Sequence, residues 1–201
     1  MSSIIQTHLS LEGLRQVIEK AKANVPESKI AEYKKGITKD EAKKRLFSQI
    51  KASGGTRIKV VNSAGKEGYI NKNTARKILD VKEGTLKPGI TIEQYWAMAA
   101  DIANLYRNST EILVHQDYKN RSRVEEIIRL VAPLYEDNYA YITAKVIKNE
   151  GQKIHYLEIS DIEKIEERLE GTLVSEAKKA IPTLTANPSP TNNIQNSPNL
   201  A

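Results

Sequence analysis

The fold follows from residues 139–160, YAYITAKVIKNEGQKIHYLEIS. Apolar side chains alternate with others along residues 139–149 and again along residues 153–160, and a period of two is typical of a β-strand that buries one face. The dipeptide Glu150-Gly151 between the two runs predicts a turn. The stretch therefore predicts a β-hairpin with an apolar face made of Ala140, Ile142, Ala144, Val146, Leu157 and Ile159.

The opposite face of this hairpin collects polar and aromatic side chains, because successive residues of a strand point to opposite faces. They are Tyr141, Thr143, Lys145, Tyr156 and Glu158. The run EILVH, residues 111–115, predicts a further strand. If Ile112 and Val114 face the core, Glu111 and His115 share the polar face with the hairpin.

Helices and a second hairpin are predicted around these strands. RIKVV (57–61) and EGYIN (67–71) flank a turn and predict the second hairpin. An apolar helical stripe begins at the capping box Thr91–Gln94 and continues to Tyr106. Helical spacing also occurs over residues 122–132, where Val124, Ile127, Ile128 and Val131 lie on one side and Pro133 ends the run. Other helices are predicted over residues 10–50, with a stop at Pro26, over 73–80, and from Ser160 to about 180.

These elements predict an α+β chain in which a small antiparallel β-sheet is packed by helices. We expect a helical N-terminal segment over residues 1–55, an α+β core over residues 56–162 and a C-terminal helix over residues 163–181. Residues 182–201 contain four prolines and no charged side chain, which predicts a disordered tail.

Composition excludes several classes of protein. The 201 residues contain no cysteine, which excludes a disulfide scaffold, a thiolate zinc site and a cysteine nucleophile. The three histidines are far apart and form no HExxH pattern, so we expect neither a metal nor another cofactor. No apolar run approaches the roughly 18 residues of a membrane span, and the first residues lack a signal-peptide core. We therefore expect no membrane association and a cytoplasmic location, or delivery into a target cell by another route.

The net charge of +6 is unevenly distributed. Residues 1–90 hold 19 Lys and Arg against 9 Asp and Glu, whereas residues 91–201 hold 12 against 16. A basic half attracts polyanions, because bound phosphates release condensed counterions. The alternative explanation is that Lys-rich helices only keep the protein surface soluble and bind no polyanion. The candidate nucleic-acid-binding residues are Arg76, Lys77, Lys119 and Arg121 for phosphate, and Tyr141 for a base.

The order of elements over residues 57–162 resembles the large polyvalent protein-associated domains of phages and mobile elements. The matching pieces are GYINKNTARKIL (68–79), YAYITAKVIKN (139–149) and IHYLEI (154–159). Such domains are related to the fold shared by barnase, EndoU, colicin nucleases and RelE, whose members are typically metal-independent ribonucleases. The resemblance implies RNA as the substrate and a cognate immunity or antitoxin protein as a partner. It assigns no catalytic residue, since these vary between branches of the group.

RNA cleavage without a metal needs a base for the 2′-hydroxyl, an acid for the leaving oxygen and cations for the charged phosphorane. On the predicted polar face, His115 is the candidate acid, because imidazole exchanges protons near neutral pH. Glu158 or Glu111 is the candidate base, and Lys145 is the candidate cation. Thr143 and Tyr156 complete the candidate catalytic set.

Our leading hypothesis is therefore a metal-independent ribonuclease effector or toxin. Cross-strand Thr, Lys, Glu and Tyr are also ordinary solvent-facing pairs. This favours an alternative, a non-catalytic phage or mobile-element module that binds nucleic acid or a host protein. A third possibility is that the chain is itself an immunity or antitoxin protein. The net negative charge of residues 91–201 allows this function, whereas the net positive charge of residues 1–90 does not favour it.

Overall fold

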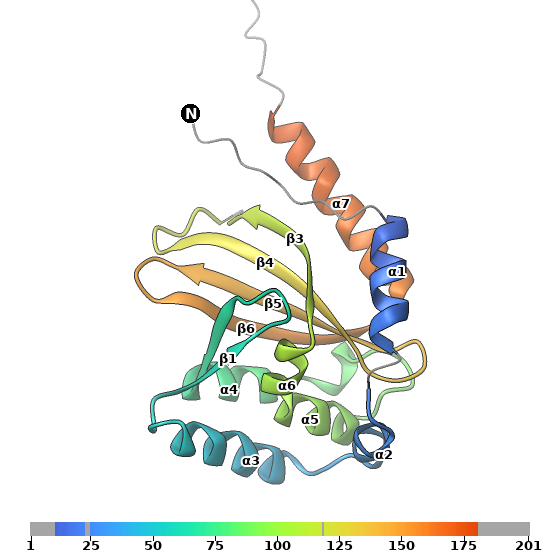
Figure 1. Ribbon diagram of the computed structural model, residues 1–201, viewed down its shortest axis with the longest axis vertical. Coiled ribbons are helices and arrows are strands. Elements are labelled where there is room, and N and C mark those ends of the chain that lie inside the picture. Colours follow the sequence, from blue (N-terminus) through green and yellow to red (C-terminus); the bar gives the residue numbers. More distant parts are fainter. Residues whose placement is uncertain (1–10, 23–24, 118, 181–201) are drawn as a thin grey trace, which may run out of the picture.

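The computed structural model describes residues 11–22, 25–117 and 119–180. They form a six-stranded sheet with helices on both faces (Figure 1). The predicted α+β class and the helical N-terminal segment are confirmed, while the predicted tail, 182–201, lies outside the described residues. No helix in these ranges is long and apolar enough to cross a membrane.

The sheet has the strand order β1-β2-β6-β5-β4-β3. Its pairings are antiparallel except for that between β2 and β6, so the sheet is mixed and not purely antiparallel. Both predicted hairpins form, as β1–β2 and β5–β6. The strands are β1 (Arg57–Val61), β2 (Glu67–Asn71), β3 (Thr110–Gln116), β4 (Val124–Pro133), β5 (Tyr139–Ile147) and β6 (Gly151–Ser160).

Side-chain caps fix where several helices begin. The Thr91 hydroxyl accepts from the Gln94 amide and the Gln94 side chain accepts from the Thr91 amide, which confirms the predicted capping box. The helix it opens is divided at Asp101. The helices are α1 (Leu11–Lys22), α2 (Glu27–Lys35), α3 (Lys39–Ala52), α4 (Lys72–Leu79), α5 (Ile92–Ala100), α6 (Ile102–Arg107) and α7 (Ile162–Ala180), with a short 3₁₀ turn at Glu83–Thr85.

The helix predicted over residues 122–132 is wrong, because this segment is strand β4. Ile128 belongs to the core on one face of the sheet and Val131 to the core on the other. A strand buried on both faces carries apolar residues at neighbouring positions, and its spacing then imitates that of a helix.

The main core lies between the sheet and helices α2–α6. The predicted apolar face of the β5–β6 hairpin points into it, with Ala140, Ile142, Ala144, Leu157 and Ile159 all buried. Tyr33 of α2 and Leu46 and Ile50 of α3 belong to the same core. The N-terminal helical segment is thus packed against the sheet through these two helices.

A second, smaller core covers one end of the opposite face. There α1 and α7 lie side by side, on the other side of the sheet from α3 and α5 (Figure 1), and the Arg15 guanidinium is 2.6 Å from a Glu166 carboxylate oxygen. Leu14, Ile18, Ile165 and Leu169 of these helices join the core formed with Leu113, Val131, Tyr139 and Tyr141 of the sheet. The face expected to be open is therefore partly covered.

Gly68 of β2 is a packing requirement of the main core. A Cβ atom at this position would lie 2.6 Å from Cζ of the fully buried Tyr106 ring. We expect Gly68→Ala to lower the free energy of unfolding by about 1–3 kcal/mol, because the ring cannot move away without disturbing the core. Urea denaturation measures this. Gly84→Ala is the control, since nothing lies within 4 Å of its Cβ position; equal losses in the two variants would contradict the packing argument.

Candidate functional site

The second face of the sheet brings the predicted catalytic residues to neighbouring positions. Thr143 pairs with Tyr156 on β6, and Lys145 pairs with Ile127, which pairs in turn with His115 on β3. Glu158 pairs with Tyr141. Residues directly opposite each other in antiparallel strands share a face, so these residues all lie on one side of the sheet. Their part in catalysis stays a prediction.

His115 is held in a fixed orientation by Arg129 of β4. The guanidinium donates from Nε to His115 Nε2 at 3.3 Å and from Nη1 to Thr143 Oγ1 at 2.5 Å. Because arginine only donates, Nε2 accepts. Nδ1 therefore carries the proton and donates to the Gln116 carbonyl oxygen, 2.8 Å from Nδ1. Both ring nitrogens are engaged, and His115 is 2% exposed. In this arrangement His115 positions Arg129 and has no nitrogen free to serve as the acid.

Glu158 is likewise engaged, by Arg168 of α7. Two nitrogens of the guanidinium lie 2.5 and 2.7 Å from the two carboxylate oxygens. The Arg168 guanidinium also lies 5.4 Å from the centre of the Tyr141 ring, and that of Arg129 lies 5.9 Å from it. Tyr141 is buried, so its ring contacts arginines where a stacked base was predicted. Glu158 is tied to α7 and is not free to act as a base.

Glu111 lies outside this group. The register shifts between Glu111 and Leu113, and both Ile112 and Leu113 join the second core. Glu111 instead places a carboxylate oxygen 2.7 Å from Lys66 Nζ, in the β1–β2 turn. The expectation that Glu111 shares the face of His115 is therefore wrong, because a β-bulge changes which side successive residues face.

Lys145 and His155 lie near four cationic side chains, and we call these six residues the basic cluster: Lys77, Lys119, Arg121, Lys145, Lys153 and His155. Burial, together with the charges of Arg121, Lys77 and Lys119, lowers the pKa of Lys145 to about 8 against the opposing effect of Asp117. Burial also lowers the pKa of His155 to about 4, with Lys145 and Lys77 as the next causes. Both groups are pushed toward their neutral forms because positive charge is concentrated around them.

Lys77 of α4 reaches the cluster beside the edge of β6. Strand β2 pairs with β6 at Gly68 and Tyr69, and the chain then enters α4. Lys77 Nζ lies 3.0 Å from His155 Nε2. Since an ammonium only donates, Nε2 accepts and the imidazole is neutral, in agreement with its low pKa.

The β3–β4 loop supplies two further cations, Lys119 and Arg121. Asp117 accepts from the Arg121 backbone amide at 3.0 Å, and the Arg121 side chain binds both its oxygens at 2.7 and 2.6 Å. The guanidinium holds the pKa of Asp117 well below its usual range. Asp117 is thus occupied by Arg121. In the described part of the chain, no carboxylate lies within 4.0 Å of the ammonium of Lys77, Lys119, Lys145 or Lys153.

Three members of the site were missed by sequence reasoning. The helix predicted over residues 122–132 includes Arg129, and the alternation along residues 153–160 singles out neither Lys153 nor His155. A register shift between Thr143 and Ala144 leaves His155 unpaired. The alternation of residues cannot reveal such a bulge. Arg76, in contrast, was predicted together with Lys77 but points elsewhere, with its guanidinium 5.8 Å from the Phe47 ring of α3.

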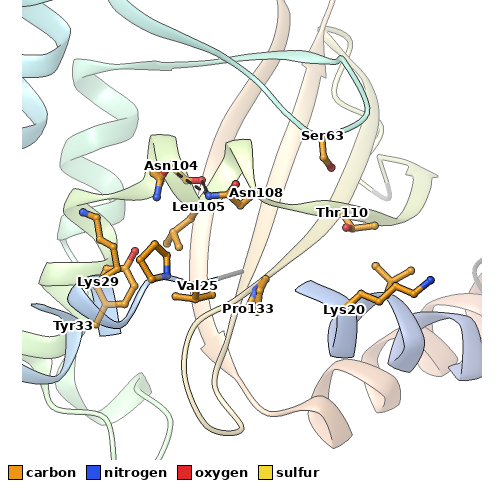
Figure 2. Close-up of a pocket in the computed structure, with 12 residues that line it drawn as sticks. Lys20, Val25, Lys29, Tyr33, Ser63, Asn104, Leu105, Asn108, Thr110 and Pro133 are labelled. Atoms are coloured by element: carbon orange, nitrogen blue, oxygen red, sulfur yellow. Dashed lines mark hydrogen bonds between the residues drawn. The ribbon is translucent and has the colours of Figure 1, made fainter. Parts of the chain in front are cut away.

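A separate cavity of about 330 Å³ lies where α1, α2 and α6 meet the start of β3 (Figure 2). Lys29 and Tyr33 line it on one side, and both contact Asp101, at 3.3 and 2.6 Å. Asn104 and Asn108 line it on another side. No member of the basic cluster reaches this cavity. Within the described ranges, no group of three or more His, Asp or Glu side chains is placed to hold a metal ion.

Comparison with known proteins adds nothing to this geometry. No family model matches the chain, and no curated protein and no solved structure is significantly similar to it. The resemblance to polyvalent protein-associated domains therefore stays a prediction.

The buried charge of Lys145 opposes folding. Its pKa is about 8 in the folded chain against 10.5 as an ordinary lysine, so folding is penalised while both states are protonated, below pH 8, and the penalty disappears as pH rises from 8 to 10.5. We expect Lys145→Met to raise the free energy of unfolding at pH 7 by on the order of 2 kcal/mol.

The advantage of this variant over the wild type should shrink above pH 8 for the same reason. Chemical denaturation at several pH values measures both effects. Lys148→Met, at an exposed position in the turn after β5, is the matched control and should change little. A Lys145→Met variant less stable than the wild type at pH 7 would show that the ammonium stabilises the fold.

Proposed function

We propose that this chain binds RNA at the basic cluster and cleaves it without a metal ion. The observation that carries the proposal is the burial of Lys145 and His155 among cations that lower both of their pKa values. A protein that keeps a lysine residue 8% exposed beside other cations loses stability, and such losses are typical of sites that serve a ligand.

A phosphodiester group fits the cluster because it supplies the missing negative charge. Among the described residues, no carboxylate lies within ion-pair distance of Lys77, Lys119 or Lys145. Their ammonium groups can form strong charge-assisted hydrogen bonds with phosphate oxygens. The surplus positive charge also raises the local concentration of a polyanion and its rate of association. Tyr156, the exposed aromatic residue on this face at 38% exposure, offers a ring against which an unstacked base can lie.

The same groups have the proton affinities that cleavage requires. Lys145, with a pKa of about 8, is mostly protonated at pH 7 and still acidic enough to protonate the leaving 5′-oxygen. His155 is neutral, and the negative charge of a bound phosphate raises its pKa and makes it a better base. A bound phosphate would draw the Lys77 ammonium away from His155 Nε2, which lies 3.0 Å from it. Nε2 would then take the proton of the 2′-hydroxyl, whose oxygen attacks phosphorus as the bond to the 5′-oxygen breaks. The products are a 2′,3′-cyclic phosphate and a free 5′-hydroxyl, with Arg121 and Lys119 stabilising the charged phosphorane.

A second candidate function is binding of RNA without cleavage. It is favoured by the engagement of His115 with Arg129 and of Glu158 with Arg168, since these two were the predicted acid and base. An immunity or antitoxin partner belongs to either proposal, and its acidic surface would cover the basic cluster.

Lys145→Met and Lys145→Arg test the proposal together. We expect a single-stranded RNA in EDTA to bind the wild type, and Lys145→Met to weaken the affinity at least tenfold while folding more stably. The affinity of the wild type should fall from pH 7 to pH 9 as Lys145 loses its proton, whereas that of Lys145→Arg should fall less, because arginine stays protonated. Fluorescence anisotropy measures both.

Cleavage is followed in the same samples. We expect products ending in a 2′,3′-cyclic phosphate, and their loss in His155→Ala. Binding that depends on Lys145 without any cleavage would support the second candidate. Equal affinity of the wild type and Lys145→Met for RNA would contradict both.

A further inference from the structure

Arg129 of β4 carries a positive charge that no carboxylate of the described chain neutralises. Its guanidinium lies on the second face of the sheet, where it donates to His115 Nε2 at 3.3 Å and to Thr143 Oγ1 at 2.5 Å. Both acceptors are neutral, since a histidine that accepts at Nε2 is unprotonated there. Within the described ranges, no carboxylate oxygen lies within 4.0 Å of the Arg129 guanidinium.

Two neighbouring arginines differ from Arg129 in this respect. Arg121 binds both carboxylate oxygens of Asp117, and Arg168 binds both carboxylate oxygens of Glu158. An ion pair of this kind satisfies the charge of the guanidinium within the protein. The charge of Arg129 is instead held in place by neutral groups, so it remains available to an anionic ligand.

The orientation of Arg129 suits a phosphate group. A guanidinium has five N–H donors in one plane, and His115 and Thr143 engage one donor on Nε and one on Nη1. The residue is partly exposed, so a ligand can reach it. Because two fixed acceptors orient the guanidinium before a ligand arrives, binding orders little that is not already ordered. Its remaining donors can contact two oxygens of one phosphate.

The register of the strands places Arg129 next to the basic cluster. Arg129 is opposite Thr143 on β5, and Lys145 is two residues further along the same strand. Successive residues on one face of a strand are about 7 Å apart. The guanidinium also contacts His115, which shares the row of Lys145 through Ile127. Arg129 and Lys145 are therefore separated by a distance that two consecutive phosphates of one strand can span.

We propose that Arg129 binds the phosphate adjoining the one held by the basic cluster, so that tight binding requires two consecutive phosphodiester groups. This inference rests on the proposed function and extends it to the substrate class, which is an oligonucleotide rather than a ligand with a single phosphate. His115 and Thr143 are positioning residues, because they act on the ligand only through Arg129.

The test uses the trinucleotide of 2′-deoxythymidine, which cannot be cleaved and has two phosphates. It is compared with two analogues in which one phosphate or the other is an uncharged methylphosphonate. We expect the wild type to bind the doubly charged strand about tenfold more tightly than either analogue, the usual effect of one charge-assisted contact. Isothermal titration calorimetry measures the affinities.

Arg129→Gln should remove this preference. We expect the ratio to fall to about two, because a doubly charged strand still has two ways to place a phosphate in the cluster, and the affinity for the analogues to change by less than about twofold. The slope of log affinity against log salt for the doubly charged strand should fall by about one, for one lost phosphate contact.

Two further variants separate phosphate binding from folding. Arg123→Gln makes the same change at an exposed arginine of the β3–β4 loop that pairs with Glu150, and it should keep the tenfold ratio. Thr143→Val keeps the Arg129 guanidinium and removes an acceptor that orients it, so the ratio should fall about threefold. Thermal unfolding shows which variants are folded, and Thr143→Val decides the question if Arg129→Gln is not.

The outcomes distinguish this inference from the proposed function. A tenfold ratio that persists in Arg129→Gln or Thr143→Val overturns the assignment of the second phosphate to Arg129. Equal binding of all three strands by the wild type overturns the need for a second phosphate. In both cases, weaker binding of the analogues by Lys145→Met still supports the cluster. Analogues that bind the wild type and Lys145→Met equally overturn the proposed function itself.

Discussion

The double burial of β5 determines both the fold and the candidate site. One side of this strand sends Ala140, Ile142 and Ala144 into the main core under helices α2–α6. The other side sends Tyr139 and Tyr141 into the second core under α1 and α7. Lys145 lies on the same side of β5 as these tyrosines, beyond the part of the sheet that α1 and α7 cover, and it is 8% exposed. A charge is thus enclosed at the point where the apolar cover ends, and that enclosure gives the ammonium its unusual proton affinity.

The electrostatics of the basic cluster follow from elements that are distant in sequence. Lys77 arrives from α4, Lys119 and Arg121 from the β3–β4 loop, and Lys153 from β6, opposite Lys145. The one carboxylate among the interactions that shift Lys145, Asp117, is bound by Arg121. The surplus positive charge is a property of the assembled fold. This surplus charge makes the cluster less stable without an anion than with one bound, which supports the proposal of a phosphate-containing ligand.

The sequence predicts β5 although both of its faces are buried, because tyrosine, threonine and lysine on the second face keep the period of two. Local chemistry determines the alternation in β5 and β6, the turns of the two hairpins and the capping box at Thr91. The sequence therefore predicts all of these features. Strand β4 was mistaken for a helix because Ile128 and Val131 are buried on opposite faces of the sheet. The shared face of Thr143, Lys145 and Tyr156 was predicted, since the period of two fixes it. Arg129 and His155 were missed because one depended on β4 and the other on a β-bulge. The engagement of Glu158 by Arg168 depends on how α7 packs, which no local pattern encodes.

The central claim is that the cations around Lys145 and His155 hold a phosphate-bearing strand. The most direct measurement is the pKa of the His155 imidazole, followed by NMR with and without a saturating uncleavable 2′-deoxy oligonucleotide. We expect a His155 pKa of about 4 in the free protein and a rise by one unit or more on binding, because a phosphate charge nearby stabilises the protonated ring. A His155 pKa that is unchanged when the oligonucleotide is bound would place the nucleic acid elsewhere and contradict the account.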